Sequence, residues 1–117
     1  MNLPESNHLK IGFICATEME AAPFLELDCC QQNVGEGRVL LTSLESELLI
    51  CGMGPEPAAQ AARELLSRSM VRLIHFGVCG GLAQGVEPGS LFAMRQAVLG
   101  DGAETAQGSW ECDTSLY

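Results

Sequence analysis

Residues 75–91 read HFGVCGGLAQGVEPGSL and join two apolar runs, at residues 71–76 and 91–94. Gly77 and the pair Gly80-Gly81 interrupt the chain where the first run ends. Glycine adopts positive φ without steric cost and lets the backbone approach a ligand closely. In α/β proteins, small ligands bind at breaks of this kind at the ends of strands. Composition alone equally allows a plain loop that uses glycine only for its turn geometry.

The pattern around this stretch predicts an α/β fold in the order β-α-β-β-α-β-β, because apolar runs of strand length alternate with runs of helical composition. Strands are expected at residues 10–15, 38–44, 47–51, 71–76 and 91–99, and helices at 18–27 and 56–69. Residues 38–51 have the form of an antiparallel hairpin, and the polar residues 28–36 are expected to be a loop. Thr17 and Glu20 have the Thr-x-x-Glu spacing of a capping box at the start of the first helix.

The composition indicates a soluble protein of one-domain length that binds no nucleic acid and no membrane. The chain has 117 residues and a net charge of −9, and its six Lys and Arg residues are scattered. No basic stripe is therefore available to neutralise the phosphates of a nucleic acid. The longest apolar runs are far too short to span a bilayer.

The cysteines indicate a reducing compartment and not a disulfide scaffold. Cys15, Cys51 and Cys79 each end an apolar run, and free cysteine behaves as a small, commonly buried hydrophobe. Residues 1–8 are polar and lack the apolar segment of a secretory leader, so we expect a cytoplasmic protein. The sequence has neither a Cys-x-x-Cys pair nor clustered histidines, so no metal site is expected.

Three loops that follow predicted strands are the candidate ligand sites, at residues 15–20, 52–54 and 77–81. The Gly-x-Gly of the second loop does not extend to a dinucleotide-binding motif, because Pro57 stands at the third glycine position. The acidic residue of that motif is also missing, and so is a Gly-Lys-Ser or Gly-Lys-Thr phosphate loop. In the first loop, the residue type and position of Glu20 suit either helix capping or catalysis.

Three segments resemble motifs of the purine nucleoside phosphorylase/nucleosidase superfamily and follow one another in the family's order. They are KIGFICATEMEA at residues 10–21, LICGMGPEPAAQAA at residues 49–62, and FGVCGGL followed by VEPGSL within residues 76–91. Within the superfamily they are most similar to 5′-methylthioadenosine/S-adenosylhomocysteine nucleosidases and to futalosine hydrolases. The resemblance implies a partial nucleoside phosphorylase-like fold, in which helices flank a mixed sheet.

The same resemblance implies cleavage of the N-glycosidic bond of a purine nucleoside, with Glu20 matching the family glutamate that positions the attacking water. The positions that match substrate-contacting residues of the family are Ala16, Met53, Val78, Cys79 and Gly80. Met53 could equally fill the core by composition, and Val78 replaces the Ser or Thr often found at its position. The arginine-bearing phosphate loop of the phosphorylases has no match here, which favours hydrolysis over phosphorolysis.

The matching residues 10–104 correspond to the N-terminal half of the family fold, between an extension at residues 1–9 and a polar tail at residues 105–117. In the family, the other half supplies the acidic pair that binds the ribose hydroxyls and the acid that protonates the leaving purine. Two functions therefore remain open: an enzyme of this class, and a non-catalytic remnant that binds a nucleoside or dimerises. The resemblance implies a homodimer and no cofactor. Asp101 falls near a family aspartate but is assigned no role.

Overall fold

The chain divides into two compact units, Met1–Cys79 and Gly80–Tyr117. The structure is a computed structural model, and it describes residues 10–26, 30–43, 46–99 and 108–112. The first unit contains a five-stranded sheet and two helices, and a two-stranded sheet lies in the second unit. The α/β class predicted from the sequence is confirmed.

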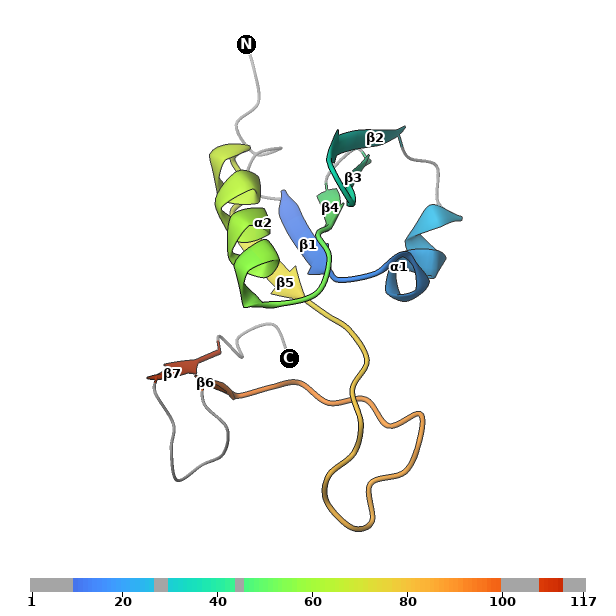
Figure 1. Ribbon diagram of the computed structural model, residues 1–117, viewed down its shortest axis with the longest axis vertical. Coiled ribbons are helices and arrows are strands. Elements are labelled where there is room, and N and C mark those ends of the chain that lie inside the picture. Colours follow the sequence, from blue (N-terminus) through green and yellow to red (C-terminus); the bar gives the residue numbers. More distant parts are fainter. Residues whose placement is uncertain (1–9, 27–29, 44–45, 100–107, 113–117) are drawn as a thin grey trace. The chain divides into compact units, whose positions relative to one another are not determined.

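The first unit is built on a mixed sheet in the order β2-β3-β4-β1-β5 (Figure 1). Its strands are β1 (Ile11–Cys15), β2 (Cys30–Gly35), β3 (Arg38–Thr42), β4 (Ser46–Ile50) and β5 (Arg72–His75). β1 runs parallel to both β4 and β5, whereas β3 is antiparallel to β2 and β4. The hairpin predicted over residues 38–51 is confirmed as β3 and β4.

The expectation of a loop over residues 28–36 is wrong where residues 30–35 form β2. Within the described ranges, this strand pairs only with β3, across a tight turn in which Gly37 has a φ of 69°. Its polar side chains are mostly exposed on both faces. Val34 alone among the residues of β2 is half-buried, against the core on the α2 face. A strand with one inward apolar residue lacks the alternation of apolar and polar residues by which strands are recognised. The strand conformation of residues 30–35 therefore depends more on pairing with β3 than on the β-propensity of these residues.

The two helices of the first unit, α1 (Glu18–Leu25) and α2 (Pro55–Ser67), cover opposite faces of the sheet (Figure 1). The buried residues on the α2 face are Ile14, Leu40, Leu49, Cys51, Ala61, Leu65 and Met70. Those on the α1 face are Cys15, Ala21, Leu41, Leu48 and Ile50. Leu40, Leu49 and Leu65 are fully buried, and burial of each such side chain contributes about 1.5–3 kcal/mol.

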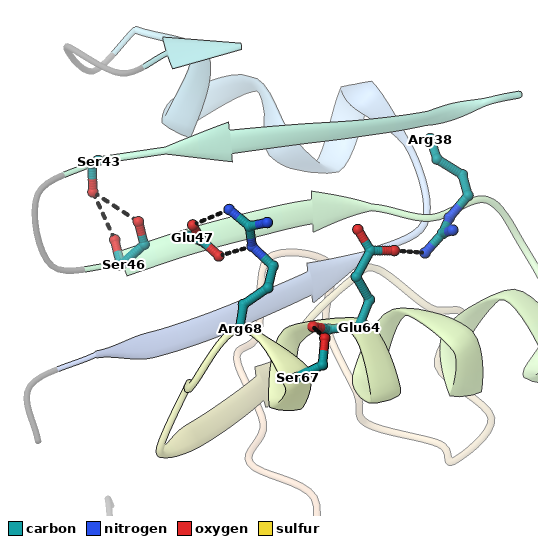
Figure 2. Close-up of polar contacts among 7 residues, drawn as sticks. All are labelled: Arg38, Ser43, Ser46, Glu47, Glu64, Ser67 and Arg68. Carbon is teal, nitrogen blue, oxygen red and sulfur yellow. Dashed lines mark hydrogen bonds and ion pairs between the residues drawn. The ribbon is translucent and has the colours of Figure 1, made fainter. Parts of the chain in front are cut away.

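Two ion pairs join the sheet to α2 (Figure 2). Arg68, just after α2, donates from Nε and Nη2 to Oε1 and Oε2 of Glu47 on β4, at 2.6 and 2.8 Å. Arg38 on β3 donates from Nη2 to Oε1 of Glu64 at 2.9 Å. The Glu47 carboxylate also raises the pKa of Arg68, chiefly through its hydrogen bonds. Glu47 is buried, so Arg68 compensates a charge that water reaches poorly.

The described part of the second unit contains an antiparallel hairpin of β6 (Gln96–Leu99) and β7 (Gly108–Glu111). The strand expected over residues 91–99 therefore begins only at Gln96. Residues 91–94 are exposed and pair with no strand within the described part of the chain. β7 lies where the sequence has no clear periodicity. Among the described residues, neither helix is long and apolar enough to cross a membrane.

Candidate functional site

Three loops of the first unit meet around a hollow at one edge of the sheet. β4 and β5 both run parallel to β1, so the carboxyl ends of the three strands lie at the same edge, where ligands of α/β proteins bind. The hollow is open to solvent and has a volume of about 370 Å³. Its lining residues are Ala16, Glu20, Met53, Gly54, His75, Phe76, Gly77 and Val78. All three candidate loops of the sequence contribute to this hollow.

The Glu20 carboxylate is the charged group of the hollow, and backbone N–H groups of two loops hold it. Its Oε1 accepts hydrogen bonds from the N–H groups of Ala16 and Thr17, each at 3.1 Å. Its Oε2 accepts from the N–H of Val78 at 3.0 Å. One side chain therefore joins the loop after β1 to the loop after β5.

The first turn of α1 positions this glutamate. Thr17 is the N-cap, in an extended conformation, and its Oγ1 accepts from the Glu20 N–H at 3.3 Å. The Glu20 side chain in turn accepts from the Thr17 N–H. These reciprocal bonds satisfy N–H groups that a helix leaves without an internal partner. The capping box predicted from the sequence is confirmed.

Replacing Thr17 with alanine is expected to lower the free energy of unfolding by about 1 kcal/mol, because the Glu20 N–H loses its side-chain acceptor. Denaturant titration followed by circular dichroism measures the change. Thr17→Ser keeps the hydroxyl and should remain close to the unsubstituted protein. Equal losses in the two variants would show that the cap contributes nothing to stability.

Gly77 permits the close approach of Glu20 to the loop after β5. A Cβ at this position would lie 2.8 Å from Oε2 and 3.4 Å from Cδ of Glu20. Any larger residue must therefore displace the carboxylate or the turn. Positive φ is found instead in the middle loop, at Gly52 and Gly54. The absence of a side chain at Gly77 thus serves a contact within the site.

The surroundings of Glu20 favour its ionised form. The hydrogen bond from Val78 lowers the pKa of Glu20 most, those from Ala16 and Thr17 lower it further, and burial opposes them. Burial raises the pKa of Cys15 to about 11, and the negative charge of Glu20 adds to this shift. Burial likewise raises the pKa of Cys51. At neutral pH the site therefore holds an anionic carboxylate beside protonated thiols, which are poor nucleophiles.

The rest of the hollow suits an uncharged ligand better than an anion. Among the described residues, those that line it include no Lys or Arg. The side chains of Met53 and Val78 are 79% and 82% exposed, so Met53 does not fill the core. Pro55 and Pro57 stand in the first turn of α2, beyond its N-cap Gly54, and neither has an N–H to donate to a phosphate.

A protein-family model described as the phosphorylase superfamily matches residues 10–113, which is most of the chain. The chain belongs to the phosphorylase superfamily. Membership suggests nucleoside phosphorylase- or nucleosidase-like activity, in agreement with the resemblance of the three motifs. Every residue that lines the hollow falls within the matched region. None of the curated proteins compared with the chain matches it significantly.

In this phosphorylase superfamily protein, the hollow brings together four of the residues predicted for the site, which are Ala16, Glu20, Met53 and Val78. Cys79 is exposed and does not line the hollow. Gly80 begins the second unit, and Asp101 lies outside the described residues. Within the described ranges, no group of three His, Cys, Asp or Glu residues is arranged to hold a metal ion.

Four residues that line the hollow were not individually predicted to contact a ligand, namely Gly54, His75, Phe76 and Gly77. Of these, Gly54 and Gly77 belong to the candidate loops. Three of the four are consecutive and extend from the last residue of β5 into the loop. A usable signal was their position, because the final residues of a parallel strand reach the edge where ligands bind. The superfamily motif drew attention to the residues immediately after them instead.

Proposed function

We propose that this protein hydrolyses the N-glycosidic bond of a purine nucleoside, with the Glu20 carboxylate positioning the attacking water. On the resemblance of its motifs, the substrate is a nucleoside of the 5′-methylthioadenosine/S-adenosylhomocysteine or futalosine type, and the enzyme is a cytoplasmic homodimer. The observation that carries the proposal is an ionised carboxylate, fixed by three backbone N–H groups, in the wall of an open hollow.

Glu20 has the hydrogen-bonding capacity to orient one water. An ionised carboxylate has about four acceptor positions, two on each oxygen. Backbone N–H groups occupy both positions on Oε1 and one on Oε2. The remaining position on Oε2 suits a water O–H. Because its lowered pKa makes Glu20 a weak base, its contribution is orientation and charge and not complete removal of a proton.

The charge of Glu20 also stabilises the sugar as the glycosidic bond breaks. Cleavage gives the ribose oxocarbenium character by analogy with glycoside hydrolysis, so positive charge develops close to the attacking water. An anion that is already fixed in place stabilises that charge without reorganising. The departing purine needs a proton as well, and an ionised carboxylate does not supply one. A second group must therefore act as the acid in this reaction.

Purine release is expected to proceed at the same rate with and without added phosphate, because the lining residues in the described part of the chain include no cation that would bind this anion. The test is incubation of the purified protein with methylthioadenosine, S-adenosylhomocysteine, inosine and futalosine, followed by chromatography of the products. Hydrolysis releases the free sugar. Dependence on phosphate, with a sugar 1-phosphate as product, would instead establish phosphorolysis.

The scarcity of acidic groups in the hollow favours a second candidate function, a protein that binds a nucleoside or dimerises without catalysis. Glu20 is the single acidic residue among the lining residues that the structure describes, whereas cleavage needs both an oriented water and a protonated leaving group. Equilibrium dialysis with the same four nucleosides distinguishes the candidates. Binding without purine release supports the second candidate, and turnover of any of them rejects it. Light scattering after size-exclusion chromatography tests the proposed homodimer.

A further inference from the structure

Two contacts join one face of α1 to the residues that follow β5. Glu20 and Phe24 are four residues apart and share one face of α1. Phe76 and Val78 are two residues apart where β5 ends. Val78 donates its N–H to Glu20 at 3.0 Å, and the ring of Phe24 stacks on that of Phe76, with centroids 5.4 Å apart and planes at 27°. A polar and an aromatic contact therefore connect the same two segments.

The aromatic contact belongs to a cluster that extends from the core to the hollow. Phe13 on β1 contacts both other rings, with centroid distances of 5.3 Å to Phe24 and 6.4 Å to Phe76. All three rings pack against the buried residues of the α1 face. Phe76 also lines the hollow. A displacement of this ring therefore affects the loop that follows it.

α1 depends on such contacts because it has little stability of its own. It is eight residues long, and Pro23 within it has no N–H to donate to the preceding turn. Isolated helices of this length do not persist in water. Ala21 is its one fully buried residue, and this small side chain constrains the rotation of the helix weakly. The ring of Phe24 therefore has a large share in setting that rotation.

We propose that Phe24 is a positioning residue, which acts through Phe76 to hold the Val78 N–H against the Glu20 carboxylate. Its effect on turnover rests on the proposed function of Glu20. The contact at Gly77 shows how little freedom the arrangement has, because even a Cβ there would approach Oε2 to 2.8 Å. A small rotation of α1 therefore lengthens the bond from Val78, and misplacement of a catalytic group by about 1 Å can cost up to about 10²-fold in rate.

The test is Phe24→Leu, which keeps an apolar side chain but removes the stacked ring. We expect kcat to fall about tenfold with little change in KM. We also expect the pKa of Glu20, measured by NMR with a 13C-labelled side chain, to rise toward the ordinary value, because the bond from Val78 lowers it most. Phe24→Tyr keeps the ring and should retain both properties. The neighbouring ionisable groups, Cys15, Cys51 and His75, are the same in all of these proteins.

Phe13→Leu is the matched control, because it removes a ring from the same cluster but leaves the stack of Phe24 on Phe76. Thermal unfolding shows whether the two variants are equally destabilised. At equal stability, a Glu20 pKa that shifts in Phe24→Leu alone supports the proposal. Equal shifts in both variants, or none in Phe24→Leu, overturn it. The NMR result does not require turnover, so absence of activity in every protein would reject the proposed hydrolysis separately.

Discussion

Replacing Glu20 with glutamine is expected to lower kcat for purine release by about 10²–10⁴-fold, with a much smaller change in KM. Glutamine keeps the shape of the side chain but has no charge, and an NH2 donor replaces one acceptor oxygen. If the amide oxygen keeps the N–H groups of Ala16 and Thr17, the NH2 group faces the N–H of Val78. The water then loses its acceptor, and the developing positive charge loses its counter-charge. Steady-state kinetics with the best nucleoside substrate measures the loss.

Glu18→Gln is the matched control for this experiment. Glu18 is an acidic residue of the same helical turn, but it is exposed and does not line the hollow. Its replacement should leave both kcat and KM close to those of the unsubstituted protein. Undiminished turnover in Glu20→Gln would reject the water-positioning role, whereas equal losses in both variants would attribute the effect to helix charge.

Stability as a function of pH gives a second readout of the same substitution. The pKa of Glu20 is lower in the folded protein than its ordinary value, so the ionised side chain stabilises the fold at neutral pH. That contribution is lost as the pH falls through the lowered pKa. The difference in free energy of unfolding between the unsubstituted protein and Glu20→Gln should therefore be largest at neutral pH and shrink in acid. A constant difference would show that the charge of Glu20 does not stabilise the fold.

The predictable part of the site depends on local chain geometry and on strand direction. Thr17 and Glu20 lie within one helical turn, so their capping box is visible as a four-residue pattern. The three candidate loops meet because each follows a strand of the parallel part of the sheet. Those strands are predictable from their short apolar runs. The bond from Val78 to Glu20, in contrast, joins residues 58 positions apart and uses a backbone N–H. No side-chain pattern encodes the direction of that N–H, so it becomes visible only in the folded structure.

The errors in the predicted strands have a common physical cause. Residues 30–35 have a polar centre, Gln31-Gln32-Asn33, and form a strand, whereas the apolar residues 91–94 do not. Hydrophobic patterning predicts which residues are buried, and it predicts a strand only where burial and pairing coincide. In β2, pairing with β3 occurs although Val34 is half-buried and the other residues of the strand are exposed. Sequence patterns therefore identified the strands that bury apolar side chains, including β5 at the other edge of the sheet, more accurately than the exposed strand β2.

Replacing Arg68 with methionine is expected to lower the free energy of unfolding by about 2–3 kcal/mol. Arg68 donates two hydrogen bonds to Glu47, whose side chain is 10% exposed. Methionine keeps an apolar stem of similar length but leaves the buried carboxylate without its counter-charge. The Arg68 side chain is itself 40% exposed, so the loss should fall below that of a fully buried pair. Denaturant titration measures the loss.

Two further variants separate the charge of Glu47 from the packing of the arginine stem. Arg38→Met breaks the pair with Glu64, whose side chain is 28% exposed compared with 10% for Glu47. The carboxylate left behind is therefore better solvated, and the loss should be about 1 kcal/mol or less. Glu47→Leu combined with Arg68→Met removes both charges, and it should recover most of the stability because apolar side chains can replace a buried ion pair at little cost. A double variant as unstable as Arg68→Met alone would assign the loss to packing. Full recovery would show that this ion pair contributes little net stability.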